Sequence, residues 1–301
     1  MVNGGTVEGR GTTRRALCVG INRFAHMPEH LWLRGCVNDA EDYRALLTGP
    51  YGFAPEEVTV LTDDAATRTA VLGALRDLVT AASVGEADHL VVTMSSHGTQ
   101  VVDTTGDEGD RVDEAFATSD LEQDGERWSR DTLILDDELR ALFARVPERV
   151  LLDVVLDTCH SGSGLELLPT ATRRPRFLPP PEPAHGARSA RPARVPPVPP
   201  TTPAGPAGPV RSSGGEGSRH VLLAACRSDE TASDALFAGR YSGACTHFLV
   251  ETLRDDPQAS RGEVLRRVRE RLAADRFYQR PQLDAPEAAL AVPWGRRYRL
   301  G

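Results

Sequence analysis

The sequence predicts an α/β domain in which helices cover both faces of a mostly parallel sheet. Apolar runs of strand length alternate with segments of helical periodicity, which is the pattern of repeated strand–helix–strand units. The most apolar runs are rich in valine and leucine and lack polar alternation, as in strands that are buried on both faces. At 301 residues, with 40% hydrophobic and 26% charged residues, the chain can bury a sizeable core.

The first half of the chain shows this alternation most clearly. Residues 1–13 are rich in glycine and threonine and are expected to fray. Asn38 and Asp39 are both suited to capping the start of the first predicted helix. The expected order is strand 15–21, helix 36–47, strand 58–62, helix 67–82 and strand 89–94.

The second half interrupts the pattern twice. An acidic, glycine-containing loop is expected at 103–120, and the segment 169–218 holds fourteen of the 22 prolines with almost no periodicity. Around these interruptions we expect a helix opening at Asp136, strands at 150–157 and 219–226, helices at 243–254 and 261–276, and a short strand around 288–292.

The proline-rich segment interrupts the chain without dividing it into two domains. Such a segment cannot bury enough apolar surface to order itself, so we expect an exposed, disordered insert at 169–218. The one strand and two helices that follow it are too few to make a core of their own. We therefore expect a single domain at 14–301, with one part at 14–168 and a second part at 219–301.

Composition and charge restrict the class of protein. All 35 basic residues are arginine, and with abundant alanine, glycine and proline this suggests a GC-rich, bacterial genome. The net charge is −8, and because the insert carries +5 the remainder carries −13. An acidic body argues against nucleic acid as the main partner and leaves cationic substrates open.

The cysteines and the hydropathy predict a soluble cytoplasmic protein. The five cysteines are odd in number and widely spaced, which gives neither a disulfide framework nor a paired-cysteine metal motif. No apolar run approaches membrane-spanning length, and the first residues lack the apolar region of a signal peptide.

Two of the predicted strands lead into reactive side chains. The run at 150–157 leads into Cys159 and the run at 89–94 leads into His97, and small residues follow each. Chemistry in open α/β sheets gathers at the carboxyl ends of strands, so this thiol and imidazole are expected at one edge. Taken singly, Cys159 can be a packing residue and His97 a strand-end cap. Taken together, they form the pair that a cysteine nucleophile with a histidine base requires.

The pair predicts a specific chemistry. An imidazole beside a thiol favours the thiolate at neutral pH, and the resulting imidazolium can protonate a leaving amine. The backbone N–H groups of Gly98 and Cys159 are candidates for an oxyanion hole, which would polarise the carbonyl under attack.

These residues belong to a series of ordered motifs. The sequences SHG at 96–98 and DTCHSG at 157–162 hold the two reactive side chains. The other motifs are ALCVGIN at 16–22, LRGCVNDA at 33–40, GDEGDRVDE at 106–114, AACRSDETASD at 224–234, GACTHF at 243–248 and RPQL at 280–283. Together they resemble the caspase-like cysteine peptidases, most closely the bacterial metacaspases (orthocaspases), over about 14–293 except the insert. The true-caspase signature QACRG is absent, and Ser96 stands where metacaspases usually have glycine.

The resemblance implies a fold, an activity and a specificity. The fold is the caspase-type three-layer sandwich, with a central, mostly parallel six-stranded sheet flanked by helices. The activity is peptide-bond hydrolysis by Cys159 with His97. In metacaspases, acids at the positions of Asp157 and Asp39 form a pocket for arginine or lysine, and paired carboxylates suit a guanidinium. Without the resemblance, Asp39 is a helix cap and Asp157 a turn residue.

The resemblance also raises calcium as a cofactor, although the chemistry itself requires none. Some metacaspases bind Ca²⁺, a hard cation that prefers oxygen ligands, through acids that match four positions of this chain. The loop from Asp103 to Glu114 does not fit the spacing of an EF-hand, and a solvated acidic face is the alternative. The four matching acids are Asp113, Asp136, Asp137 and Glu166.

The position of the insert suggests self-cleavage. It separates the two reactive residues from the last strand and helices, where caspase-like enzymes have their junction between large and small subunits. An exposed, arginine-rich chain beside an arginine-selective site invites cleavage by that site, and a plain tether is the alternative. The candidate arginines are Arg173, Arg174, Arg176, Arg188, Arg191, Arg194 and Arg211.

Three other functions are alternatives to an arginine-specific endopeptidase. A catalytically silent, partner-binding protein of the same fold is disfavoured by the intact pair, since a silent copy often loses one member. A related peptidase that cuts after aspartate is disfavoured because Asp157 and Asp39 would repel an acidic substrate. An unrelated flavodoxin-like binding domain does not explain the motifs. We expect a monomer acting on protein or peptide substrates, with an activator protein left open and neither nucleic acid nor membrane as partner.

Overall fold

A six-stranded sheet forms the centre of the molecule. The computed structural model describes residues 13–102, 112–159, 172–181 and 220–298. The strand order is β14-β11-β9-β3-β1-β2, with every neighbouring pair parallel except β11 and β14. The elements run in the order β1 (Arg14–Gly20), α1 (Cys36–Thr48), β2 (Val58–Thr62), α2 (Arg68–Ser83), β3 (His89–Ser95), β4 (Gly98–Val102), β5 (Val112–Ala117), β6 (Gln123–Asp124), β7 (Arg127–Trp128), β8 (Leu133–Leu135), α3 (Asp136–Phe143), β9 (Leu151–Asp157), β10 (Arg173–Pro175), β11 (His220–Ala224), β12 (Ser233–Phe237), β13 (Arg240–Gly243), α4 (Ala244–Asp255), α5 (Arg261–Ala274), β14 (Gln282–Asp284) and α6 (Glu287–Leu290).

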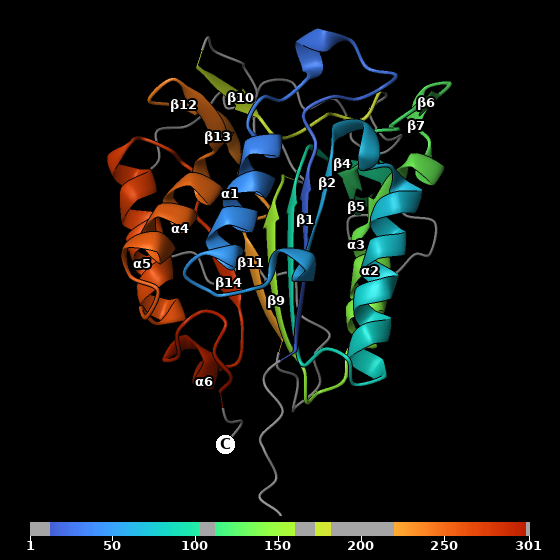
Figure 1. Ribbon diagram of the computed structural model, residues 1–301. Helices are drawn as coiled ribbons and strands as arrows, with labels where there is room; N and C mark the ends of the chain where they lie inside the picture. The colour runs from blue at the N-terminus through green and yellow to red at the C-terminus, as the bar shows by residue number, and fades with distance from the viewer. Residues whose placement is uncertain (1–12, 103–111, 160–171, 182–219, 299–301) are drawn as a thin grey trace, which may run out of the picture.

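Helices cover both faces of this sheet. Helices α1, α4 and α5 lie on one side and α2 and α3 on the other (Figure 1). Each side has its own hydrophobic core, because side chains of the central strands point alternately to the two faces. Leu17 and Val19 of β1 pack toward α2, whereas Ala16 and Cys18 pack toward α1. The predicted three-layer α/β fold with a mostly parallel six-stranded sheet is confirmed.

The register of the parallel strands sets the level at which they end. Gly20 of β1 lies beside Ser95 of β3, and Ser95 lies beside Asp157 of β9. The segments that follow these three strands therefore begin at one edge of the sheet. Strands on the two sides of the proline-rich insert share this sheet, because β11 pairs with β9.

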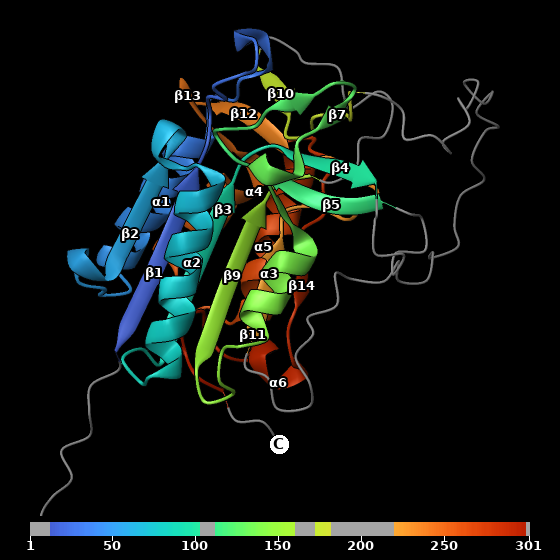
Figure 2. The same cartoon turned by 90° about the vertical axis from the view of Figure 1, so that its right-hand side faces the viewer.

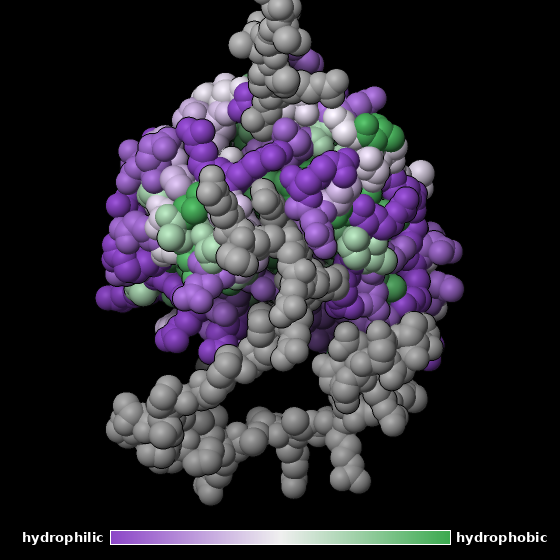
Figure 3. Space-filling model, turned by 90° about the horizontal axis from the view of Figure 1, so that it is seen from below, coloured by the Kyte–Doolittle hydropathy of each residue, from purple (hydrophilic) through white to green (hydrophobic). Residues whose placement is uncertain are grey.

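Smaller sheets cover the carboxyl edge. One holds β10, β12 and β13, and another holds β4, β5 and β8. Both lie at the end of the molecule toward which the parallel strands point (Figures 1 and 2). The opposite end is mostly hydrophilic, with small hydrophobic areas between the charged side chains (Figure 3). Among the described residues, no helix is long and apolar enough to cross a membrane.

Several sequence-based expectations are corrected. The short apolar run at 288–292 is not a strand, because Glu287–Leu290 forms α6 and the last strand is the earlier β14. The acidic loop expected at 103–120 contains β5, which pairs on both sides with β4 and β8. Helix α1 begins after Gly35, so neither Asn38 nor Asp39 is its N-terminal cap. The Asp39 side chain makes other contacts, which are described below.

The beginning of the proline-rich segment is also ordered, contrary to expectation. Residues 172–181 are described, and β10 pairs antiparallel with β12. Phe177 and Leu178 are buried, although the segment has no apolar periodicity. The order of this segment comes from contacts with the carboxyl edge of the sheet rather than from an apolar face of its own.

Candidate active site

Cys159 and His97 lie two residues beyond neighbouring strands, β9 and β3. Because Ser95 and Asp157 are in register, both segments leave the sheet at the same edge. Cys159 is fully buried and His97 nearly so. The fold thus brings to one edge the two reactive side chains that the sequence predicted there.

The hydrogen bond of His97 defines its tautomer. Its Nε2 lies 2.7 Å from the carbonyl oxygen of Leu31, which can only accept a hydrogen bond. Nε2 therefore carries the proton, and Nδ1, which has no hydrogen-bond partner among the described residues, presents a lone pair. Burial lowers the pKa of His97 to about 4, and the charge of Arg176 contributes to the decrease. The imidazole is neutral at pH 7 and can accept a proton at Nδ1.

The thiol of Cys159 lies against the segment that follows β11. The backbone N–H of Ala232 donates to Cys159 Sγ, and the Sγ of Cys226 lies 3.8 Å away. Among the contacts of the described residues, none joins this Sγ directly to the imidazole. The described contacts of the thiol are thus with Ala232 and Cys226.

A backbone carbonyl of the same chain accepts from the two predicted oxyanion-hole donors. The N–H groups of Gly98 and Cys159 lie 2.9 and 3.3 Å from the carbonyl oxygen of Arg176. A Cβ atom at position 98 would overlap the carbonyl of Cys159, so this close approach requires glycine. Two donors that converge on one carbonyl oxygen form the geometry of an oxyanion hole.

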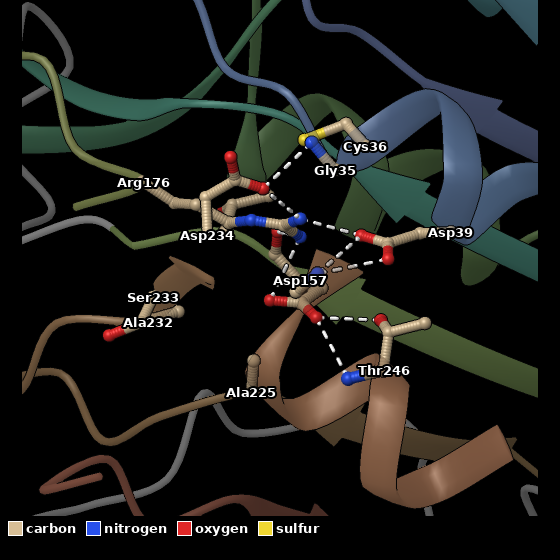
Figure 4. A network of polar contacts seen from close by, with 12 residues as sticks. Gly35, Cys36, Asp39, Asp157, Arg176, Ala225, Ala232, Ser233, Asp234 and Thr246 are labelled. Carbon is tan, nitrogen blue, oxygen red and sulfur yellow. Dashed lines mark hydrogen bonds and ion pairs between the residues drawn. The ribbon is translucent and has the colours of Figure 1, made fainter. Parts of the chain in front are cut away.

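The side chain of Arg176 fills a fully buried acidic pocket. Its Nη2 lies 2.6 Å from Asp39 Oδ2 and 3.1 Å from Asp234 Oδ1. Its Nη1 lies 3.1 Å from Asp157 Oδ1. The carboxylates come from α1, β12 and the end of β9 and surround the guanidinium (Figure 4). The structure thus brings Asp157 and Asp39 together and adds Asp234 as a third acid.

Neighbouring donors orient two of these carboxylates. Asp39 accepts from Ser242 Oγ at 2.6 Å and from the Gly243 N–H at 3.0 Å. Asp157 Oδ2 accepts from Thr246, through the hydroxyl at 2.6 Å and the N–H at 3.1 Å. A Cβ at Gly243 would overlap Asp157, so the strand-to-helix corner needs a glycine.

The third carboxylate is held in the same way. Asp234 accepts from the backbone N–H groups of Arg34 and Gly35, both at 2.9 Å. Directed hydrogen bonds of this kind hold like charges together and fix the orientation of the oxygen atoms that contact the cation.

The charge balance of the pocket favours a bound cation. Burial raises the pKa of Asp39 to about 6, while Arg176 opposes this increase. Burial likewise raises the pKa of Asp234. Burial alone would lower the pKa of Arg176, but Asp157 and Asp39 raise it well above its usual value. Three carboxylates and one guanidinium leave a net negative pocket that holds arginine in its charged form.

The backbone around Arg176 lies across the site as an extended strand. Arg174 of β10 is in register with Asp234 of β12, and the Arg176 N–H donates to Ala232 O at 2.9 Å. On the other side, the Leu178 N–H donates to Gly98 O at 2.9 Å. The segment is therefore bound as an extended peptide between Ala232 and Gly98, and the carbonyl of the Arg176–Phe177 bond contacts the backbone of Gly98 and Cys159.

The predicted calcium ligands are paired with arginine. Asp136 and Asp137 both contact Arg140, and Asp113 lies 2.6 Å from Arg130. Glu166 lies outside the described residues. Within the described ranges, no group of three or more acids, histidines or cysteines is placed so that it could hold a metal ion. These residues do not present a ready calcium site in this conformation.

Sequence reasoning missed Asp234 and singled out Arg176 only as one of seven arginines. Asp234 lies about 200 residues from Asp39 in the chain and follows no strand-end pattern, although it closes the motif at 224–234. The local signal for the ordered part was the pair Phe177 and Leu178, because the insert holds no other aromatic residue, leucine, isoleucine or methionine. Arg188, Arg191, Arg194 and Arg211 lie outside the described residues.

Comparisons with known proteins find relatives over most of the chain. Residues 14–168 match the family described as metacaspase, peptidase C14 domain. Metacaspase-1 of Mycosarcoma maydis is 30% identical over 295 residues, which cover 90% of this chain and 70% of that protein. Metacaspase-1A of Aspergillus niger is 30% identical over 303 residues, which cover 93% and 72%.

Two solved structures share the fold. Protein GSU0716 from Geobacter sulfurreducens matches with a TM-score of 0.62 and 24% identity, covering 93% of this chain and 97% of that one. Caspase-1 from Spodoptera frugiperda matches with a TM-score of 0.52 and 14% identity, covering 91% and 89%.

Proposed function

Because the chain belongs to the metacaspase family of cysteine-type peptidases, we propose that it is an endopeptidase that cuts after arginine, and less readily after lysine, with Cys159 as nucleophile and His97 as base. The single observation that supports this most strongly is the position of Arg176. Its side chain fills the pocket of three carboxylates, while its carbonyl oxygen accepts from Gly98 and Cys159. A substrate arginine would make the same contacts.

The chemistry follows from these positions. The thiol of Cys159 gives its proton to Nδ1 of His97, and the sulfur attacks the carbonyl carbon of the substrate arginine. The oxygen becomes negatively charged and is stabilised by the N–H groups of Gly98 and Cys159. His97 then protonates the leaving amine, and water hydrolyses the acyl-enzyme.

The pocket favours arginine over lysine. Each terminal nitrogen of Arg176 contacts a different carboxylate, Asp157 at Nη1 and both Asp39 and Asp234 at Nη2. A planar guanidinium satisfies several fixed acceptors at once, whereas the single ammonium of lysine cannot reach them all at these distances. An aspartate side chain would meet three buried acids and is excluded.

The same contacts support self-cleavage at the Arg176–Phe177 bond. Of the seven candidate arginines, Arg176 alone among the described ones places its side chain in the acidic pocket. Arg174 donates to the carbonyl oxygens of His30 and Trp32, and Arg173 to those of Asp275 and Arg276. Until this bond is cut, the segment occupies the site that substrates need, so in the intact chain it competes with substrates for binding.

Calcium activation remains a prediction. Asp136 and Asp137 would have to leave Arg140 before they could bind a metal ion. A calcium-dependent rate of self-cleavage would support such a rearrangement, and an unchanged rate in excess chelator would contradict it.

The test compares the wild type with Cys159→Ala on fluorogenic peptides that end in arginine, lysine or aspartate, with and without calcium. The matched control is Cys245→Ala, which removes another fully buried thiol, on α4. We expect arginine cleavage in the wild type and the control but not in Cys159→Ala. Cleavage only after aspartate would overturn the specificity, and no turnover of any peptide would favour a silent, partner-binding protein.

Intact-mass measurement tests the self-cleavage separately. The wild type is expected to give two fragments that join at Arg176–Phe177, and Cys159→Ala a single chain. A fully active enzyme with one uncut chain would refute self-cleavage and leave the proposed peptidase activity standing.

A further inference from the structure

A second arginine of the bound segment has a site of its own. The guanidinium of Arg173 lies over the ring of Phe277, with its carbon 4.0 Å from the ring centroid. Its two terminal nitrogens donate to the carbonyl oxygens of Arg276 and Asp275, each at 2.9 Å. An aromatic face below and two acceptors at the edge match the flat faces and in-plane donors of a guanidinium.

The end of α5 builds these acceptors. The helix finishes at Ala274, and Arg276 adopts a left-handed conformation with φ of 59°. This conformation ends the helix and turns the following chain, so that carbonyl oxygens at the negative end of the helix dipole face outward. Such a helix end attracts a cation without using an acidic side chain.

Packing fixes the ring of Phe277. It contacts the rings of Phe237 and Phe248, at centroid distances of 5.8 and 6.3 Å, and is 7% exposed. The guanidinium of Arg173 borders an open pocket of about 370 Å³ that these residues help to line. A side chain can therefore enter from solvent onto a ring that is already in place.

The register connects this site to the catalytic pocket. Arg173 pairs with Ala235 on β12, and Arg176 follows three residues later with its carbonyl in the oxyanion hole. A substrate bound in the same extended register would place the residue three positions before its cut arginine on Phe277. We propose that Phe277, with the carbonyls of Asp275 and Arg276, is a substrate subsite that selects arginine at that position.

The inference rests on the proposed function and restricts the range of preferred substrates. The preferred substrate then carries two arginines that are three residues apart, and the bond after the second is cut. An uncharged residue at the upstream position leaves the two carbonyls to water and the ring uncovered, so it binds more weakly but is still cut.

Two peptides of identical composition test this register. In ARRPR the fourth residue from the cut is arginine, whereas in RARPR the arginine lies one position further upstream. With self-processed wild type, we expect kcat/KM for ARRPR to exceed that for RARPR by about tenfold, the effect of one cation–π contact with its hydrogen bonds. Because the two net charges are equal, general attraction to an acidic protein cannot cause a difference.

The variant Phe277→Leu assigns the preference to the ring. In this variant, the ratio of kcat/KM for ARRPR to kcat/KM for RARPR is expected to fall to about two. The value of kcat/KM for RARPR itself should stay within about twofold of wild type. The matched control is Phe248→Leu, in the same aromatic cluster, which should keep the preference. A thermal melt of each variant checks folding.

The outcomes separate the two proposals. Equal rates on the two peptides, or an equal loss on both in Phe277→Leu, would overturn the subsite and leave arginine cleavage intact. Cleavage of neither peptide by the wild type would overturn the proposed function, and the subsite with it.

Discussion

The variant Asp39→Asn tests the acidic pocket most directly, because it changes one charge and almost no volume. Asp39 Oδ2 lies 2.6 Å from Arg176 Nη2, and both groups are fully buried. Its Oδ1 accepts from Ser242 and Gly243. The single oxygen of asparagine would keep accepting from these two donors, so its NH₂ group would face the guanidinium. Both groups are hydrogen-bond donors, so no hydrogen bond could form between them.

The expected loss follows from this geometry. A hydrogen bond to a charged group contributes about 1.5–3 kcal/mol. Because about 1.4 kcal/mol corresponds to a factor of ten, kcat/KM for an arginine peptide should fall by roughly 10–150-fold. Because two donors would face each other, we expect a decrease in kcat/KM near the upper end of this range.

The pH dependence of KM gives an independent test of the role of Asp39. Burial raises the pKa of Asp39 from 3.8 to about 6, so the carboxylate that binds arginine becomes protonated as the pH falls through about 6. KM for arginine peptides should therefore rise between pH 7 and pH 5 in the wild type. In Asp39→Asn, which has no proton to gain at this position, the rise should disappear.

The assay is steady-state hydrolysis of arginine peptides by both proteins across this pH range. The matched control is Asp42→Asn, which changes a partly exposed acid on the same helix. The Oδ2 atom of Asp42 lies 2.5 Å from Nη1 of Arg240. The control should stay within about twofold of wild type. Equal loss in both variants, or an unchanged KM profile in Asp39→Asn, would refute the assignment of Asp39 to the pocket.

Three further predictions concern the bound segment and the dyad. In the Cys159→Ala background, Arg176→Gln leaves three buried carboxylates without a cation and should lower the free energy of unfolding by about 3–5 kcal/mol, measured by urea unfolding; an unchanged midpoint would contradict the buried ion pairs. Burial lowers the pKa of His97 to about 4, so the imidazole that accepts the thiol proton stays neutral, and the step that needs it should persist, down to about pH 4; a loss of self-cleavage with an apparent pKa near 6.5, the ordinary value of histidine, in a mass-spectrometric time course would count against this account. Gly98→Ala should abolish peptide cleavage, because its Cβ would overlap the Cys159 carbonyl, and retained activity would show that the loop can move aside.

The local sequence pattern was sufficient to predict the central strands and the positions of Cys159 and His97. Valine- and leucine-rich runs identify the buried strands, and parallel strands in register end at one edge, so the positions of Cys159 and His97 follow from the chain itself. The short apolar run at 288–292 was misassigned, because so few residues fit a strand and a single helical turn equally well.

The contents of the pocket were decided only by tertiary structure. Asp234 meets Asp39 and Asp157 because β12 folds back across the carboxyl edge, and no periodicity reports a contact between residues about 200 positions apart. Arg176 orders its segment through buried ion pairs and oxyanion-hole hydrogen bonds rather than through an apolar face. Composition therefore predicted disorder throughout 169–218, whereas the fold holds residues 172–181 of this segment against the active site.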